Sequence, residues 1–179
     1  MEIEELKPIL EAIIYVADDP VRLDQLQEIF PGESREQVEL ALQQLMQEFN
    51  SRPGGMWIRE VAEGHRMTTR PEHHEYIRTY LKLKPGARLS LAALETLAVI
   101  AYRQPVTLAE ILAIRGKKST SALRTLLEKK LVTIAGRKAT VGRPILYGTS
   151  KEFLIHFGLK DLSELPTLEE FAQMAGGQL

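Results

Sequence analysis

Two stretches of this chain, almost half its length apart, repeat the same short pattern. Leu-Glu-Ala-Ile-Ile-Tyr-Val-Ala at 10–17 is echoed by Leu-Glu-Thr-Leu-Ala-Val-Ile-Ala at 94–101, and each is soon followed by Pro-Val-x-Leu, at 20–23 and 105–108. A repeat at this spacing has the length of a small domain and is much longer than a solenoid unit. The pattern therefore predicts a chain built from two copies of one small domain.

The first copy has helix signals followed by strand signals. Apolar residues at helical spacing predict a first helix with Leu6, Ile9, Leu10, Ile13 and Ala17 on its buried face. A short extended piece at 21–23 precedes helices over 24–30 and from 34 to 49. The buried stripe expected on the latter helix is Val38, Ala41, Leu42, Leu45 and Phe49. Strands are predicted at 56–61 and 65–69, and a further helix over 71–81.

The second copy repeats this order. Helices are predicted from 91 to 101, from 107 to 114 and from 119 to 130, with an extended residue at 106. The first of these has Leu91, Leu94, Ala98 and Ala101 on one face and forms, with the Leu10 helix, the scaffold common to both copies. A capping box of Thr107 and Glu110 is expected to open the second. Strands at 131–135 and 145–147 follow, and Thr149 with Glu152 is expected to cap a last helix. Helix, short strand, helix, helix and a two-stranded wing is the order of a winged helix.

The predicted fold class is therefore mainly α with small antiparallel β wings, arranged as tandem winged-helix domains. An N-terminal domain is expected over 1–81, a linker over 82–88, a C-terminal domain over 89–160 and a tail over 161–179. In the tail, Thr167 and Glu170 could cap a short helix carrying Leu168 and Phe171. Each domain is small enough to be marginally stable alone, so docking or dimerisation would help to stabilise it.

The residue types needed for catalysis or metal binding do not converge in the sequence. Cysteine is absent, which excludes disulfides, Cys-ligated zinc and thiol catalysis. The four histidines lack metal-ligand spacing, and neither a phosphate-binding loop nor a Gly-x-Ser-x-Gly elbow is present. We therefore expect no cofactor and no enzymatic activity; a hydrolase would need a site that the sequence does not offer. The acidic N-terminus and the short apolar runs favour a cytoplasmic protein without membrane contact.

The two halves of the chain differ in net charge. Residues 1–81 contain 8 basic and 16 acidic residues, for a charge of −8, whereas residues 82–179 contain 15 and 8, for +7. The third helix of the first copy exposes glutamates and glutamines that phosphate would repel, which favours protein binding or self-association, although a merely solvated acidic face is an equal alternative. The asymmetry indicates different partners for the two domains.

The basic charge concentrates in one segment of the second copy. From Arg115 to Arg143 there are nine basic residues and one acid, Glu128, and they fall on the turn, third helix and wing that would face DNA in a winged helix. Solvated lysines or an acidic protein partner would explain the same pattern. The candidate nucleic-acid contacts are Lys117, Lys118, Arg124, Lys129, Lys130 and Lys138.

The second half of the chain contains a series of distinctive motifs. They are the run from Leu89 to Thr107, Ile114-Arg115-Gly116, the run from Leu123 to Glu128, Gly136-Arg137-Lys138, the run from Gly142 to Thr149, and the ending from Phe153 to Leu159 with 162–166. Together these motifs resemble one known family, segregation and condensation protein B. The first half is similar to the family mainly in its helix pattern and over 10–26.

The resemblance implies an adaptor. Members of this family are tandem winged-helix proteins that dimerise through the N-terminal domain and bind a kleisin, segregation and condensation protein A. The kleisin bridges the heads of an SMC ATPase in the complex that condenses and segregates the bacterial chromosome, so a nucleoid-associated homodimer is expected, with weak or indirect DNA contact.

The surface that would contact the kleisin is expected in the second domain. Apolar and aromatic candidates, for each of which burial in the core is the competing interpretation, are Tyr102, Leu112, Tyr147, Phe153 and Phe157. Arg115, Arg137 and Arg143 could form bidentate bonds to acidic partner residues. The alternative function is a winged-helix DNA-binding transcriptional regulator.

Overall fold

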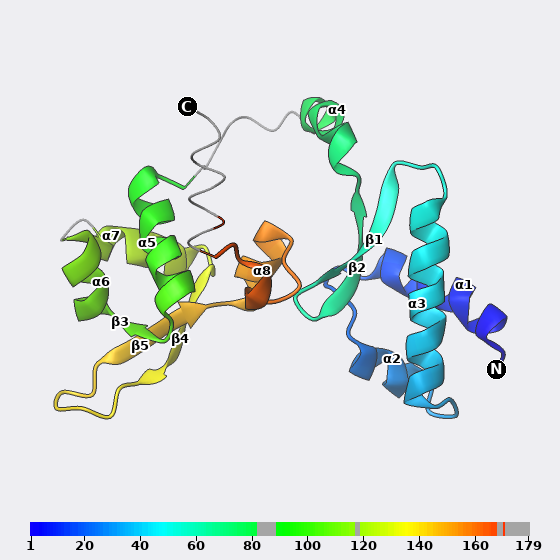
Figure 1. Cartoon of the computed structure of the whole chain (residues 1–179), viewed down its shortest axis with the longest axis horizontal. Helices are drawn as coiled ribbons and strands as arrows, with labels where there is room; N and C mark the ends of the chain where they lie inside the picture. The colour runs from blue at the N-terminus through cyan, green and yellow to red at the C-terminus, as the bar shows by residue number, and fades with distance from the viewer. Residues whose placement is uncertain (82–88, 117–118, 168–169, 171–179) are drawn as a thin grey trace. The chain divides into compact units, whose positions relative to one another are not determined.

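The computed structural model describes residues 1–81, 89–116, 119–167 and 170. Residue contacts divide the chain into two units, Met1–Lys84 with Gly158–Leu179, and Pro85–Phe157. Figure 1 shows the helices and strands of both units. Each has the predicted order of helix, extended residue, helix, helix and two-stranded wing, so the fold class, mainly helical with small antiparallel sheets, is confirmed.

The first unit begins with three helices, α1 (Ile3–Val16), α2 (Leu23–Ile29) and α3 (Arg35–Ser51). Val21, between α1 and α2, forms a single antiparallel bridge with His65 and is the predicted short extended piece. The wing is the antiparallel pair β1 (Met56–Val61) and β2 (Gly64–Thr69). A 3-10 turn, Pro71–His73, then leads into α4 (His74–Tyr80).

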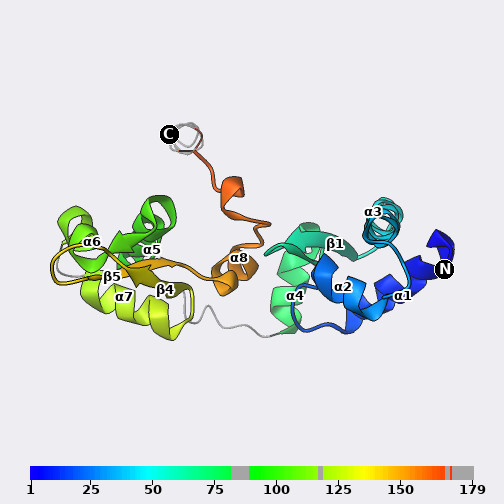
Figure 2. The ribbon, with the colours of Figure 1, turned by 90° about the horizontal axis from the view of Figure 1, so that it is seen from below.

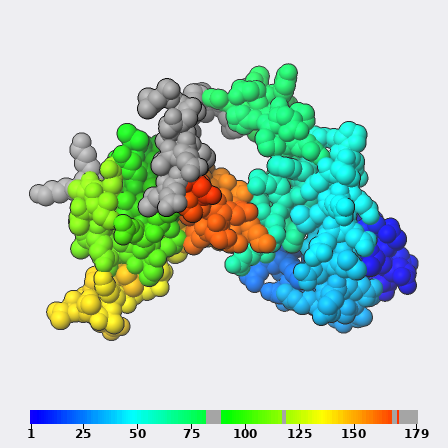
Figure 3. Space-filling view, viewed as in Figure 1, coloured from blue at the N-terminus to red at the C-terminus, as the bar shows by residue number. Residues whose placement is uncertain are grey.

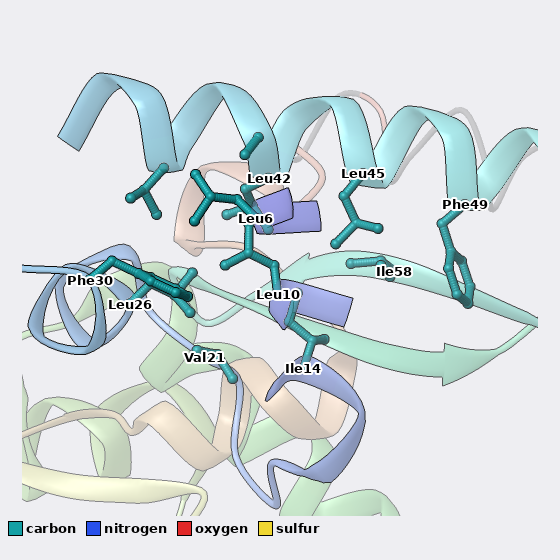
Figure 4. Packing of buried hydrophobic residues seen from close by; sticks show 12 residues of the cluster. Leu6, Leu10, Ile14, Val21, Leu26, Phe30, Leu42, Leu45, Phe49 and Ile58 are labelled. Atoms are coloured by element: carbon teal, nitrogen blue, oxygen red, sulfur yellow. The ribbon is translucent and has the colours of Figure 1, made fainter. Parts of the chain in front are cut away.

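The core of the first unit lies between α3 and the elements it covers. Figure 4 shows Leu42, Leu45 and Phe49 of α3 pointing towards Leu10 of α1 and Ile58 of β1. The predicted buried face of α3, formed by Val38, Ala41, Leu42, Leu45 and Phe49, is confirmed in full. Figures 1 and 2 show α3 packed across α1 and α2, which closes this core.

The buried face of α1 differs from the prediction. Leu6, Leu10 and Ile14 are almost fully buried, whereas Ile9, which was expected on the same face, is 38% exposed. The reason is geometric, because a helix can turn only one stripe towards α3 and Ile14 lies four residues after Leu10. Lys7 is also buried; its ammonium reaches the carboxylates of Glu4 and Glu48, both at 2.7 Å.

Helix α4 buries none of its residues. Tyr76 and Tyr80 are 79% and 84% exposed, and Leu81, which follows the helix, is 53% exposed. Figure 3 shows the side chains of α4 standing out from the rest of the first unit. Among the described residues, α4 therefore has little packing against the core of its unit.

Residues after Phe157 return to the first unit, although the sequence assigned 158–160 to the second domain. The backbone N–H groups of Ala62 and Glu63 donate to the carbonyls of Leu159 and Lys160 at 2.9 and 3.0 Å. Lys160 pairs with Glu60 at 3.0 Å, and Arg59 donates to the carbonyl of Gly158. Ala62 and Glu63 have φ angles of +51° and +60°, a conformation that costs energy in non-glycine residues, and these bonds help to hold it.

The second unit contains α5 (Leu91–Arg103), α6 (Leu108–Arg115), α7 (Ser119–Glu128) and α8 (Lys151–Phe157). Its sheet has the strand order β3 (Val106–Thr107), β5 (Ile145–Thr149), β4 (Val132–Arg137), and all pairs are antiparallel. The first strand of the wing is longer than predicted, because a bulge between Ile134 and Gly136 lets pairing continue to Arg137. Figure 1 shows the loop between β4 and β5 reaching beyond the ends of both strands.

The predicted cap of α6 is confirmed, whereas that of α8 is displaced by one residue. Thr107 and Glu110 form a complete capping box at the start of α6. The Lys138 ammonium at 2.6 Å, followed by the N–H and hydroxyl of Thr107, lowers the pKa of Glu110 to about 2. At α8 the hydroxyl of Ser150, not of Thr149, accepts a hydrogen bond from the N–H of Phe153.

The chain after α8 is described in part. A 3-10 turn, Leu162–Glu164, lies within the stretch of the tail that was expected to be irregular. The predicted cap between Thr167 and Glu170 is confirmed by two hydrogen bonds, of 2.8 and 3.2 Å. Leu168 and Phe171, the apolar residues expected on the helix that this cap would open, lie outside the described residues, as does the linker 82–88.

The repeated sequence pattern does not correspond to repeated burial. Leu10 is fully buried, but Leu94, its counterpart in the repeat, is 45% exposed. Leu97 occupies the equivalent buried place in α5, and Ala93 and Ala101 match Leu6 and Ile14 in burial. The shift arises because four residues separate α1 from Val21, whereas only Gln104 and Pro105 separate α5 from β3.

Within the described ranges, no helix combines the length and the apolar character that crossing a bilayer requires.

Replacing Leu10 and Leu94 by alanine should give very different results. Leu10→Ala creates a cavity in a packed core, so we expect the free energy of unfolding to fall by about 2–5 kcal/mol. Leu94→Ala removes an exposed side chain, so the change should stay within about 0.5 kcal/mol. Urea unfolding of the full chain measures both, and an equal loss for the two variants would show that this burial assignment is wrong.

The Glu110 capping box should make the second unit sensitive to acid. Because the folded-state pKa of Glu110 lies near 2, below its ordinary value of 4.5, its ionised form stabilises the fold above about pH 4.5, and this stabilisation is lost as the pH falls towards 2. Calorimetric melting temperatures of the wild type and of Glu110→Gln should therefore differ at pH 6 and converge near pH 2. A difference that does not depend on pH would contradict the assigned ionisation.

Candidate functional site

An exposed apolar stripe runs along α5. Leu91, Leu94 and Tyr102 are 73%, 45% and 41% exposed, and Ala98 between them is also exposed. Positions spaced by three and four residues lie on one side of a helix, so these four side chains form a continuous strip, which we call the α5 face. The opposite side of α5 is buried through Ala93, Leu97 and Ile100. Exposed apolar patches of this kind mark interaction surfaces.

One edge of the α5 face is fixed by an ion pair. The guanidinium of Arg115, at the end of α6, bonds the carboxylate of Glu95, which lies beside the α5 face. Ile114, the residue before Arg115, is 53% exposed. Arg115 was expected to pair with an acidic partner residue; in this structure its guanidinium instead joins α5 to α6.

The predicted aromatic contacts lie in different environments. Tyr102 belongs to the α5 face, and Phe157, at the end of α8, is 45% exposed. Leu112 and Tyr147 are half-buried. Phe153 is only 3% exposed, and its ring lies 4.8 Å from that of Phe157, so its side chain belongs to the core and does not offer a contact surface.

Two predicted arginines lie on the wing. The Arg137 guanidinium donates to the carbonyl of Arg143 at 3.1 Å, and the N–H of Arg143 donates to the carbonyl of Thr140 at 2.9 Å. These bonds close a turn in which Gly142 and Arg143 have φ angles of +81° and +41°. Val141 at its tip is fully exposed. Arg137, the last residue of β4, and Arg143, in the loop that follows, are thus both exposed and are linked by a hydrogen bond.

Carboxylates neutralise part of the basic segment. Arg124 pairs with Glu128 at 3.0 Å and Lys138 with Glu110 at 2.6 Å, in addition to the bond between Arg115 and Glu95. Lys129 and Lys130 are exposed, and within the described residues neither has a carboxylate in ion-pair distance. Lys117 and Lys118 lie outside the described residues. The positive field of this segment is therefore weaker than the sequence suggests.

The first unit also has an uncovered apolar surface, on α1. Tyr15 and Val16 are 72% and 77% exposed, Ile9 is 38% exposed, and Pro8 and Ala12 are exposed as well. Helical spacing places these residues on the side of α1 opposite Leu10. We call them the α1 outer face. It is apolar, whereas the outward residues of α3 include Glu36, Glu39 and Glu48, as the sequence predicted.

A pocket in the first unit is lined by both charged and apolar side chains. Its lining residues are Leu23, Glu39, Leu42, Gln43, Met46, Glu60, Glu63, His65 and Lys160. Burial lowers the pKa of His65, which keeps its imidazole neutral at pH 7, and Glu60 is engaged by Lys160. In the parts of the chain that the structure describes, no three His, Cys, Asp or Glu side chains converge as metal ligands.

Three of the four residues of the α5 face, Leu91, Leu94 and Ala98, were not predicted from the sequence to be partner contacts. The repeat aligned Leu94 with Leu10 and suggested that it belonged to the scaffold. A signal was nevertheless present, because α5 has apolar residues on two sides, which is more than one core can cover.

Comparison with known proteins identifies the family. The model of the segregation and condensation complex subunit ScpB matches residues 8–168. Segregation and condensation protein B of Desulforamulus reducens is 48% identical over 168 residues, which are 94% of this chain and 92% of the relative. The solved ScpB of Mycobacterium tuberculosis is 38% identical, with a TM-score of 0.43, and the match covers 89% of this chain and 98% of that one.

A further solved structure is a dimer of a ScpB N-terminal domain complexed with a ScpA peptide. It is 22% identical, with a TM-score of 0.40, and the match covers 44% of this chain and 96% of that one. The extent of the family match and the identity to the Desulforamulus relative show that this chain belongs to the family of the segregation and condensation complex subunit ScpB.

Proposed function

We propose that this chain is a non-enzymatic adaptor subunit of an SMC–kleisin complex that condenses and segregates the chromosome in the cytoplasm, at the nucleoid. The first domain serves self-association, and the second binds the kleisin, segregation and condensation protein A. Membership of the segregation and condensation complex family supports this role. The resemblance of the motifs from Leu89 to Leu159 supports the choice of partner.

The observation that carries kleisin binding is the α5 face. Leu91, Leu94, Ala98 and Tyr102 offer apolar area along about three turns of helix. An amphipathic helix lays contacts at i, i+3, i+4 and i+7 into such a surface, so a helical kleisin segment is the partner that fits. The Glu95–Arg115 pair beside it would set the register through polar contacts at the rim.

Arg137 and Arg143 are proposed as a second, polar contact. Both are exposed on the wing, and the bond from Arg137 to the carbonyl of Arg143 keeps them together. A guanidinium binds a carboxylate with two parallel bonds, so acidic residues flanking the kleisin helix would pair here.

The α1 outer face supports self-association of the first domain. Its apolar residues project from the side of α1 that the unit does not cover. A twofold-symmetric dimer would bury this face on both copies, because one patch then occurs twice in the interface.

A DNA-binding regulator is the second candidate, and one observation favours it. Several exposed basic side chains of the second unit have no ion pair within the described residues. They are Arg103, Lys129, Lys130, Arg137, Arg143 and Lys151. On α7, however, Arg124 is paired with Glu128. A helix that reads bases in a groove needs side chains free to contact them, so this pairing favours backbone attraction over sequence reading.

Changing the α5 face should weaken the kleisin complex without harming the fold. We expect Leu91→Gln/Leu94→Gln to lower the affinity for the kleisin at least about tenfold, because it removes apolar contacts from the centre of the proposed interface. The measurement is isothermal titration of the full chain with the kleisin. Ile134→Thr, which changes a residue 58% exposed on β4, is the control and should bind normally. Unchanged affinity of the double variant would rule out the α5 face.

Reversal of Lys129 and Lys130 separates the two candidate functions. We expect the pure chain to bind duplex DNA no more tightly than about micromolar, without sequence preference and with a steep dependence on salt. Lys129→Glu/Lys130→Glu should weaken this binding and leave kleisin affinity unchanged. Mobility shifts at several salt concentrations test this, and tight, sequence-selective binding would instead support the regulator.

A further inference from the structure

Helix α4 of the first unit has an amphipathic pattern, and most of its apolar side is left exposed by the residues that the structure describes. Tyr76, Ile77, Tyr80 and Leu81 lie at i, i+1, i+4 and i+5, which gathers them on one side of the helix, and Glu75 and Thr79 lie away from it. Figure 1 shows α4 beyond the end of β2, away from α1, α2 and α3. We call Tyr76, Ile77, Tyr80 and Leu81 the arm face.

A helix of this length is not stable through its own hydrogen bonds. Isolated helices shorter than about 12–15 residues are marginal in water, so most of their stability comes from packing. Helix α4 has seven residues and buries none of them. The described residues of its own unit therefore do not supply the packing surface on which such a helix depends.

We infer that α4 is an exchanged arm, whose arm face packs on the α1 outer face of a second copy of this chain while the partner's arm packs in return. The inference rests on the proposed self-association of the first domain and specifies its geometry. The same unit carries two unsatisfied apolar surfaces, the arm face and the α1 outer face. A twofold axis that brings one against the other satisfies both on both copies.

The area involved fits a pair of arms better than a single one. A tyrosine side chain buries roughly 200 Å², and Tyr76 and Tyr80 are 79% and 84% exposed. Covering them on two arms removes about 650 Å² from water, and the surfaces that cover them lose a similar area. The total, about 1,300 Å², lies within the range of stable specific interfaces, whereas one arm bound to an unrelated peptide reaches only about half of it.

Tyr76→Gln/Tyr80→Gln tests the arm. Glutamine keeps helix propensity and removes the aromatic area, so the full-length variant should fold normally and dimerise at least about 100-fold more weakly. Sedimentation equilibrium over a range of concentrations gives the dimer dissociation constant, and circular dichroism checks the fold. Leu40→Gln, on α3 of the same unit and 44% exposed in the wild type, is the matched control and should dimerise normally.

Disulfide trapping distinguishes exchange between chains from folding back within one chain. The chain has no cysteine, so single substitutions report cleanly. Full-length Tyr80→Cys and Val16→Cys, carried by copies with tags of different size, should form a mixed disulfide dimer on oxidation, and Tyr80→Cys with Leu40→Cys should not. The double variant Val16→Cys/Tyr80→Cys should link between chains.

The outcomes separate this inference from the function on which it rests. A wild type that stays monomeric would overturn both the homodimer and the exchanged arm. A variant Tyr76→Gln/Tyr80→Gln that dimerises like the wild type would overturn the arm alone, and so would a disulfide formed only within one chain. Normal dimerisation with lost kleisin binding would assign the arm to the kleisin and likewise overturn the inference.

Discussion

The packing of Leu6, Leu10 and Ile14 against α3 decides which side of α1 faces outward. These three side chains are almost fully buried, and they meet Leu42 and Leu45 across the core. Once this stripe is turned inward, Ile9, Tyr15 and Val16 must face outward, because residues on one helix cannot change side independently. The exposed apolar surface of the first unit is thus a direct consequence of how its core is closed.

The same constraint, with a different register, operates in the second unit. Ala93, Leu97 and Ile100 are buried in α5, and the α5 face is what remains. The shorter connection between α5 and β3 produces this register, so nearly identical sequences turn different residues outward in α1 and α5. A duplicated domain has in this way acquired two distinct apolar surfaces.

Local signals in the sequence predicted most of the fold. Periodicity identified the buried side of α3, and spacing identified the Thr107–Glu110 cap. Two assignments differ from the structure, and both depend on tertiary packing. Leu94 was assigned to the scaffold because it aligned with Leu10, but its side chain is exposed. Residues 158–160 pair with the turn after β1, a segment far away in the chain. Neither helix propensity nor spacing specifies which of two apolar stripes meets the core.

The candidate site was predicted less well than the fold. Tyr102 lies on an exposed stripe, and Arg137 and Arg143 are exposed on the wing, as required of contact residues. Phe153 is core, and Arg115, Arg124 and Lys138 are engaged by carboxylates that the sequence did not pair with them. The pairs of Arg115 and Lys138 depend on how helices and wing come together, which a count of charges along the chain does not contain. The Arg124–Glu128 pair spans one turn of α7 and could have been predicted from its spacing.

The central claim is that one domain serves self-association and the other holds the kleisin, so that the two activities coexist. Light scattering of the full chain, alone and with the kleisin, tests this most directly. We expect a mass of about twice 20.2 kDa for the chain alone, and a larger complex that still contains two copies once the kleisin is added. A monomer in isolation, or a dimer that the kleisin splits, would contradict it.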